Sequence, residues 1–222
     1  MIDIEFQGFG KIPRLFRDVV ITEKIDGTNA AIGIVPVESD WDVPDDAASV
    51  IIFEGGMAGT YAVYAQSRKR LITPAKDNHG FARWVYENAL SLVHDLGPGL
   101  HFGEWWGSGI QRGYGLQKGE KRFSLFNVKR WMEAYPISHA GQETCFLPKS
   151  FKTSGLGVVP VLYRGPFSTT AVSATLFDLN AFGSQAAPGF DRPEGIIIYH
   201  TAGNQLFKVT VENDEKPKAL VS

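Results

Sequence analysis

The sequence predicts an α+β fold with antiparallel sheets, and two observations carry this prediction. β-prone runs outnumber the two or three segments of helical periodicity, and the two kinds do not alternate as they would in a doubly wound parallel fold. Hydrophobic residues make up 44% of the 222 residues and charged residues 21%, a balance typical of a packed core rather than of a disordered chain. This length fits one large domain better than two small ones, so residues 1–222 are expected to form a single domain.

Apolar periodicity places the individual elements. Residues 1–17 are a lead-in that could include a short helix, and the acidic stretch 36–46 is expected to be a surface loop. Residues 79–96 carry one apolar stripe at three- and four-residue steps and predict a long helix, and a shorter helix is expected at 173–182. Strands are predicted, in chain order, at 19–21, 30–35, 49–53, 61–66, 100–107, 122–128, 158–163, 195–199 and 206–211.

Composition limits the classes of partner. The formal net charge of −2 argues against a surface that attracts nucleic acid everywhere, so a nucleic-acid partner has to be bound by local basic patches. Cys145 is the only cysteine, which excludes an intrachain disulfide and suits a reducing cytoplasm. The sequence shows neither a signal peptide nor a run of about 18 apolar residues, so no membrane contact is expected.

Lys24 stands where two predicted strands meet, within Glu23-Lys24-Ile25-Asp26-Gly27-Thr28-Asn29. One interpretation is a nucleophilic amine, because partial burial between apolar strands disfavours an ammonium group, and Asp26 could orient the amine or hold a metal. Gly27 would then let a phosphate or a base approach the backbone. The other interpretation is a hairpin turn at Asp26-Gly27, with Lys24 and Asp26 as a solvated ion pair. The heptapeptide alone does not decide between them.

Other charged residues share this unusual placement at the ends or insides of predicted strands. Buried charges need partners, and a groove that holds one ligand would supply partners for all of them. A phosphorylated nucleotide with a divalent metal satisfies the set, because cations would meet phosphates while carboxylates meet sugar hydroxyls and the metal. The residues concerned, besides Lys24, are Arg68, Glu104, Glu194 and Lys208.

In order along the chain, these segments resemble the motifs of the covalent nucleotidyltransferases, which include ATP-dependent RNA and DNA ligases and GTP-dependent mRNA capping enzymes. The Thr-Asn tail of the first motif is typical of RNA ligases that seal breaks in RNA. Any single motif is weak, whereas the ordered set from Lys24 to Lys208 is specific. The matching segments are 23–29, Ser67-Arg68, 102–107, 123–128, 194–197 and 207–209.

This resemblance implies a nucleotidyltransferase (ligase adenylation) domain, with antiparallel β-sheets, a nucleotide groove between them and flanking helices. It implies that Lys24 attacks ATP to form lysyl–AMP, that the AMP passes to an RNA 5′-phosphate, and that a 3′-hydroxyl then displaces it. The expected ligands are ATP, Mg²⁺ or Mn²⁺, and RNA ends. A cytoplasmic monomer is expected, of a kind that would suit phage-encoded RNA repair.

The resemblance also implies a role for each matching residue. Lys24 is the nucleophile, assisted by Asp26 and Lys208. The adenine would be recognised through the backbone of Glu23 and would stack on Phe126. Arg68 would contact the ribose and a phosphate, Glu104 the ribose hydroxyls, and Lys208 the α-phosphate. Glu194 and Asp26 would bind the metal.

Three departures from the family's motifs limit which residue roles can be carried over to this chain. Thr210 stands where the last motif commonly has a second lysine, so one phosphate contact is missing or comes from Lys216 or Lys218. Asn127 stands where the family often has aspartate. The segment after Lys208 is too short for the C-terminal barrel of DNA ligases and capping enzymes. The catalytic domain itself is therefore expected to hold RNA, through Arg70, Arg112, Lys118, Lys121 and Arg122.

Two alternatives to an ATP-dependent RNA ligase stay open. A capping-type guanylyltransferase would use GTP, and the Thr-Asn tail and the missing barrel count against it. A non-catalytic nucleotide- or RNA-binding relative is conceivable because of Thr210, although Lys24, Glu104 and Glu194 are all retained.

Overall fold

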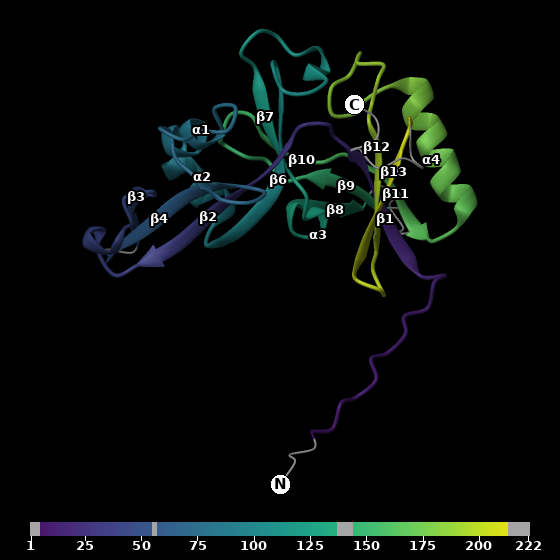
Figure 1. Cartoon of the computed structure of the whole chain (residues 1–222), viewed down its shortest axis with the longest axis horizontal. Coiled ribbons are helices and arrows are strands. Elements are labelled where there is room, and N and C mark those ends of the chain that lie inside the picture. The colour runs from purple at the N-terminus through teal and green to yellow at the C-terminus, as the bar shows by residue number, and fades with distance from the viewer. Residues whose placement is uncertain (1–4, 55–56, 137–143, 213–222) are drawn as a thin grey trace. The chain divides into compact units, whose positions relative to one another are not determined.

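The structure, a computed structural model, describes residues 5–54, 57–136 and 144–212 (Figure 1). The chain divides into two compact units, each built from segments that are distant in sequence. Both units combine mainly antiparallel sheet with few helices, which confirms the predicted α+β class. Unit 1 comprises Met1–Lys24, Val161–Gly183 and Asp191–Ser222, and unit 2 comprises Ile25–Pro160 and Ser184–Phe190.

Unit 1 is one antiparallel sheet with a helix packed on one face. The helix α4 (Thr169–Phe182) begins at Ser168, whose hydroxyl accepts a hydrogen bond from the Ala171 amide at 3.0 Å. Leu179 of α4 packs with Val19, Ile21, Ile196 and Ile198 of the sheet, so alternate residues of the strands face the helix. The strand order is β11 (Val161–Pro166), β1 (Asp18–Lys24), β12 (Gly195–His200) and β13 (Gln205–Thr210).

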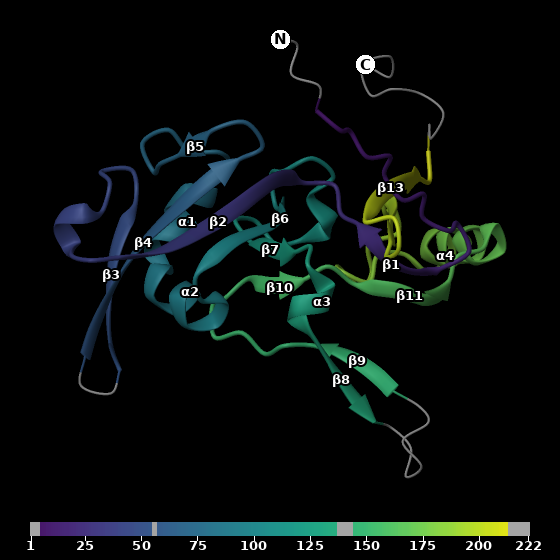
Figure 2. The same ribbon diagram turned by 90° about the horizontal axis from the view of Figure 1, so that it is seen from below.

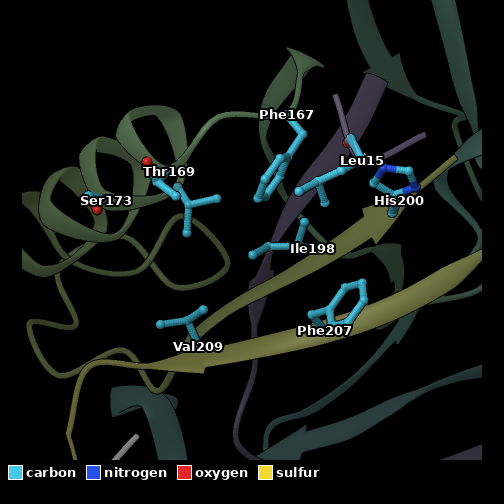
Figure 3. A pocket seen from close by; sticks show the side chains of 9 residues that line it. Leu15, Phe167, Thr169, Ser173, Ile198, His200, Phe207 and Val209 are labelled. Atoms are coloured by element: carbon cyan, nitrogen blue, oxygen red, sulfur yellow. Dashed lines mark hydrogen bonds between the residues drawn. The ribbon is translucent and has the colours of Figure 1, made fainter. Parts of the chain in front are cut away.

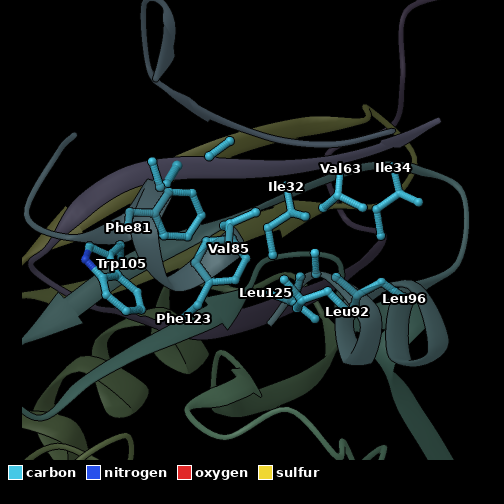
Figure 4. Packing of buried hydrophobic residues seen from close by; sticks show 14 of the residues in the cluster. Ile32, Ile34, Val63, Phe81, Val85, Leu92, Leu96, Trp105, Phe123 and Leu125 are labelled. Carbon is cyan, nitrogen blue, oxygen red and sulfur yellow. The ribbon is translucent and has the colours of Figure 1, made fainter. Parts of the chain in front are cut away.

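Unit 2 is built on a larger sheet with two helices on one face (Figure 2). The helices α1 (Phe81–Glu87) and α2 (Ala89–Leu96) pack Phe81, Val85 and Leu92 against Ile32, Phe123 and their neighbours (Figure 4). The strand order is β10 (Leu156–Val158), β7 (Lys121–Leu125), β6 (Gly99–Gly107), β2 (Thr28–Val37), β4 (Met57–Ser67) and β3 (Ala48–Glu54), with β5 (Leu71–Ile72) also paired to β4.

Short elements complete unit 2. The helix α3 (Val128–Trp131) leads into a separate hairpin of β8 (Met132–Pro136) and β9 (Thr144–Pro148). The 3-10 turns are η1 (Asp40–Asp42), in the predicted acidic loop, and η2 (Gly113–Gly115). Among the described residues, every helix is too short or too polar to cross a bilayer.

The predicted helix over 79–96 is wrong in its continuity. Its apolar stripe faces the sheet as expected, but the helix breaks at Asn88, whose φ and ψ are −108° and 11°. The Asn88 side-chain amide donates to the Trp84 carbonyl at 2.8 Å, and the Asn88 backbone amide donates to the same carbonyl at 3.1 Å, so both donors of Asn88 cap the end of α1. Residues 79 and 80 have φ of 53° and 82°, which keeps them outside the helix.

Three other predictions need correction. The strand over 158–163 is two strands in different units, separated at Pro160, which has no N–H to give to a sheet. Residues 5–17 of the lead-in contain no helix. The helix expected at 173–182 starts four residues earlier, at Thr169, where the Ser168 cap stands. Lys216 and Lys218 lie outside the described residues.

His101 makes the stability of unit 2 depend on pH. Burial lowers the pKa of His101, the hydrogen bond of its Nε2 to the Gly97 carbonyl at 2.9 Å opposes this, and the Arg130 charge lowers it further. The unfolded chain therefore binds this proton more readily, and the free energy of unfolding is expected to fall as pH drops below the ordinary histidine value of about 6.5. Urea titrations across this range should show a smaller fall for His101→Gln, whereas the exposed His94→Gln should behave like the wild type.

Candidate active site

Lys24 is the last residue of β1 and lies against a buried carboxylate. Its Nζ forms an ion pair and hydrogen bond with Glu194 Oε2, although the two residues are 170 positions apart. The Glu194 side chain is 5% exposed and the Lys24 side chain 20%, so the amine is accessible and the carboxylate is nearly enclosed. In this sheet Lys24 pairs with Gly195, which places Glu194 immediately beside it. At Gly195 a Cβ would collide with the backbone of β13, so this close approach needs glycine.

The other predicted cation of unit 1 lies on the same face of the sheet. Lys208 pairs with Ile197, which pairs with Thr22, and Thr210 pairs with Gly195, which pairs with Lys24. Residues directly opposite in an antiparallel sheet share a face, so Lys24, Lys208 and Thr210 all lie on the face away from α4. Lys208 is exposed there, two rows of pairs from Lys24.

Thr210 and Glu23 are two further motif positions in the sheet of unit 1. The Thr210 hydroxyl donates to the Glu212 carbonyl at 2.9 Å and stands in the same row as Lys24. The departure from the last motif therefore puts a short neutral side chain, rather than a second lysine, in the row of the proposed nucleophile. Glu23 is 1% exposed and lies on the face of the sheet that carries Ile196.

Asp26 and Gly27 are fixed by hydrogen bonds within unit 2. The Asp26 amide donates to Tyr114 Oη at 2.8 Å, and its carboxylate meets Arg112 Nε at 3.3 Å. The Gly27 amide donates to Glu104 Oε1 at 3.2 Å. Tyr114 is itself buried between Trp106 and Phe190, with ring centroids 5.2 and 4.6 Å away. A buried tyrosine and a carboxylate therefore set the backbone path of the first motif.

The hairpin interpretation of Asp26-Gly27 is wrong. The strands on either side, β1 and β2, belong to different sheets and do not pair with each other. The solvated pair of Lys24 with Asp26 is not formed either, because Lys24 contacts Glu194 and Asp26 contacts Arg112. The local sequence was compatible with a turn, but pairing partners from distant parts of the chain determine the course of the backbone.

The face of the large sheet that lacks α1 and α2 carries Glu104 and Phe126. Gly103 and Trp105 point into the helix-covered core, so Phe102, Glu104 and Trp106 point the other way. The Phe126 amide donates to the Phe102 carbonyl at 3.0 Å, which continues the β6 and β7 ladder by one position. Phe102 and Phe126 are 47% and 39% exposed, so two neighbouring rings are open to a ligand.

Phe102 and Tyr114 are residues of the candidate site that sequence reasoning missed. The alternation along 102–106 was the available signal for Phe102, since every second residue of a strand faces the same side. Tyr114 had no comparable signal, because its role depends on the fold of the glycine-rich loop, where it adopts a φ of 52°.

Arg68 lies at the end of β4, in a tight turn. The Ser67 amide donates to the Arg70 carbonyl at 2.9 Å, and Arg68, Lys69 and Arg70 are all exposed. Ser67 pairs with Ala30, so Arg68 follows next to Asn29, the residue that pairs with Glu104. The end of the second motif and Glu104 of the Gly-Glu motif therefore lie on opposite sides of β2, in strands that both pair with it.

The cations predicted to bind RNA have different surroundings. Arg112 pairs with Asp26, and Arg122 pairs with Glu120 at 2.6 Å and lies 5.6 Å over the Trp106 ring. Lys118 and Arg70 are exposed, and Lys121 is half-buried. Their contact with RNA stays a prediction.

The donors for a metal are sparse. Within the described part of the chain, no group of three or more acidic, histidine or cysteine residues gathers in one place. Mg²⁺ commonly keeps several waters and uses one or two carboxylates with substrate phosphates, so a single carboxylate such as Glu194 fits this ion. Asp26, held by Arg112, stays a predicted ligand.

Comparison with known families gives the class of this protein. The family model described as RNA ligase matches residues 17–210, which is most of the chain and includes every predicted motif. The chain therefore belongs to the RNA ligase family, as the motifs indicated, and is a ligase enzyme with RNA as its substrate. A comparison with curated proteins gave no match.

Gly27 offers a test of how tightly the first motif is packed. A Cβ at this position would lie 2.5 Å from the Trp105 carbonyl and 2.8 Å from Trp106 Cβ. Gly27→Ala is therefore expected to lower the free energy of unfolding by about 1–3 kcal/mol, because β6 has to move. Urea titration measures this loss. Gly157→Ala is the control, because a Cβ there meets nothing within 4 Å.

Proposed function

We propose that the protein is an ATP-dependent RNA ligase with the nucleotidyltransferase fold, and that Lys24 carries AMP as a covalent intermediate. The observation that most supports this is the contact of the partly exposed Lys24 amine with the buried Glu194 carboxylate. An ammonium group cannot attack phosphorus, so the lysine has to lose a proton first. A carboxylate that already touches the amine can accept it or hold a group that promotes its loss.

The proposed first step forms one bond and breaks another. The Lys24 nitrogen bonds to the α-phosphorus of ATP, the bond from that phosphorus to the bridging oxygen breaks, and pyrophosphate leaves with the electron pair. An oxygen of an RNA 5′-phosphate then attacks the lysine-bound AMP, and Lys24 leaves as the amine. A 3′-hydroxyl attacks the activated RNA phosphate, loses its proton, and releases AMP. Lys208, exposed on the face of Lys24, is suited to meet the α-phosphate.

Unit 2 supplies groups suited to the nucleoside. Glu104 is a carboxylate able to accept hydrogen bonds from ribose hydroxyls, and it is held by the Gly27 amide. Phe126 offers an exposed ring, and Arg68 offers an exposed cation at the end of β4, in the same sheet. Mg²⁺ or Mn²⁺ would be held by Glu194 and would offset the charge of the phosphates.

Labelling tests the proposal directly. The protein is incubated with ATP or GTP labelled at the α-phosphate, with Mg²⁺ or Mn²⁺, and is then denatured. The expected result is an ATP-derived label that survives denaturation and alkali but is released by acid, as a phosphorus–nitrogen bond is. An adduct formed from GTP alone would point to the guanylyltransferase, and ATP binding without release of pyrophosphate would point to a non-catalytic relative.

Phe126→Ala separates nucleotide binding from chemistry. Loss of a stacking ring is expected to weaken ATP binding by about 1–3 kcal/mol while the saturated rate of adduct formation stays close to that of the wild type. The adduct rate measured over a range of ATP concentrations gives both quantities. Phe146→Ala, which removes an exposed phenylalanine ring from β9, should change neither.

A further inference from the structure

Residues 5–17 form an exposed arm that leads into β1 (Figure 1). Every residue of this arm is exposed, and the structure shows no helix or strand in it. The exposed fractions are 94% for Phe6, 90% for Phe9 and 75% for Phe16. Ile12 and Leu15 are exposed as well, so large apolar side chains follow one another along this short segment, and a grouped apolar surface of this kind marks an interaction site.

The arm is anchored only at its junction with the sheet of unit 1, as far as the described residues show. The Leu15 carbonyl accepts a hydrogen bond from His200 Nε2 at 2.7 Å, and the Arg17 carbonyl accepts one from the Phe167 amide at 2.9 Å. The Leu15 side chain lines an apolar pocket of about 390 Å³ beside Phe167 and Ile198 (Figure 3). The junction is therefore fixed, whereas the rings of Phe6 and Phe9 lie beyond it.

Cations are interleaved with these rings. Residues 6–17 contain Lys11, Arg14 and Arg17 and no acidic residue, although the whole chain has a net charge of −2. The arm is thus a basic segment of an otherwise acidic protein. Alternating rings and cations suit single-stranded nucleic acid, because bases stack on the rings while phosphates pair with the cations.

The apolar pocket beside Leu15 is a poorer partner for the arm than RNA is. The residues that line it, from Leu15 to Val209, include no acidic side chain, so an arm of a second copy bound there would leave its cations unpaired. A single-stranded nucleic acid, by contrast, forms ion pairs with the cations through its phosphates and stacks its bases on the rings. The charge of the arm therefore favours RNA over self-association.

We propose that residues 6–17 bind a single-stranded part of the RNA substrate close to the end that is joined. This inference rests on RNA being the substrate of the proposed ligase. β1 connects Arg17 to Lys24 over seven residues, a span of about 23 Å at the rise of a strand. RNA held by the arm would thus lie within a few nucleotides of the end of β1 that carries Lys24.

Binding of a labelled single-stranded RNA of about a dozen nucleotides, followed by fluorescence anisotropy, tests this with the full chain. Phe6→Ala with Phe9→Ala is expected to raise the Kd at least tenfold, roughly, since each ring stacks on a base. Lys11→Ala with Arg14→Ala is expected to reduce the slope of log K against log salt by about 1.4, the value for two phosphate contacts of a single strand. Both variants should keep the melting temperature of the wild type, because the changed side chains are exposed.

Matched controls change the same kinds of residue elsewhere. Trp41→Ala removes a 96% exposed ring from an acidic loop, and Lys129→Ala removes an exposed cation, and both should bind RNA as the wild type does. Unchanged RNA affinity of the arm variants would overturn the proposal. Loss of a dimer in sedimentation runs, with RNA binding intact, would assign the arm to self-association instead.

The lysyl–AMP assay separates this inference from the proposed function. Arm variants should form the adduct from ATP at the wild-type rate when RNA is absent, because Phe6, Phe9, Lys11 and Arg14 take no part in that step. A wild-type chain that forms no adduct would refute the proposed function, whereas adduct formation with unaltered RNA affinity of the variants would refute only the role of the arm.

Discussion

Lys24→Arg is expected to form no covalent adduct with AMP under conditions in which the wild type is fully labelled. Arginine keeps a positive charge beside Glu194, but its guanidinium stays protonated and cannot act as a nucleophile. The loss should therefore be complete rather than partial. Denaturing gels of protein incubated with ATP labelled at the α-phosphate measure it.

Two further variants show that the loss is chemical. Lys24→Ala should also form no adduct, and it should melt at a lower temperature than Lys24→Arg, because it removes the cation that faces a buried carboxylate. Lys152→Arg changes an exposed lysine and should label like the wild type. Label that persists in Lys24→Arg would place the nucleophile at another residue and contradict the proposed mechanism.

Glu194→Gln is expected to slow adduct formation by about a hundredfold or more, with little change in ATP affinity. Glutamine keeps the size of the side chain but cannot accept the proton of Lys24, and removing a positioned proton acceptor commonly costs 10²–10⁴ in rate, roughly. Single-turnover labelling over a range of ATP concentrations separates the rate from the affinity.

The metal dependence of Glu194→Gln distinguishes the two roles open to this carboxylate. If Glu194 holds the metal, raising the Mg²⁺ or Mn²⁺ concentration should restore part of the rate, whereas a proton acceptor cannot be replaced in this way. Asp178→Asn, an exposed change on α4, serves as the control for loss of negative charge. A wild-type rate in Glu194→Gln would remove this residue from the reaction.

Much of the fold was predictable because its strands carry strong local signals. Alternating or continuous apolar runs placed β2, β6 and β12 within a few residues of their observed bounds. The signals failed where a single residue overrides periodicity. Asn88 breaks an otherwise regular helical stripe, and Pro160 separates two strands that the apolar pattern joins.

The candidate site was predictable as a set of residue types but not as a set of contacts. Charges inside apolar strands are costly without partners, and this cost alone indicated Lys24, Glu104 and Glu194. Their actual partners depend on register between strands that lie far apart in sequence, as with Lys24 and Gly195. Tyr114 shows the same limit, because its hydrogen bond to Asp26 spans 88 positions.

The interleaving of the two units along the sequence determines the order in which a growing chain can assemble its proposed reactive centre. Lys24 leaves the ribosome early, but its partner Glu194 follows 170 residues later, a delay on the order of ten to thirty seconds at typical rates of translation. Most of unit 2 is synthesised in that interval, whereas the sheet of unit 1 has to wait for β12 and β13. A nascent polypeptide interrupted before residue 194 would thus carry the lysine without the carboxylate that contacts it, and under the proposed mechanism it would form no adduct with a nucleotide.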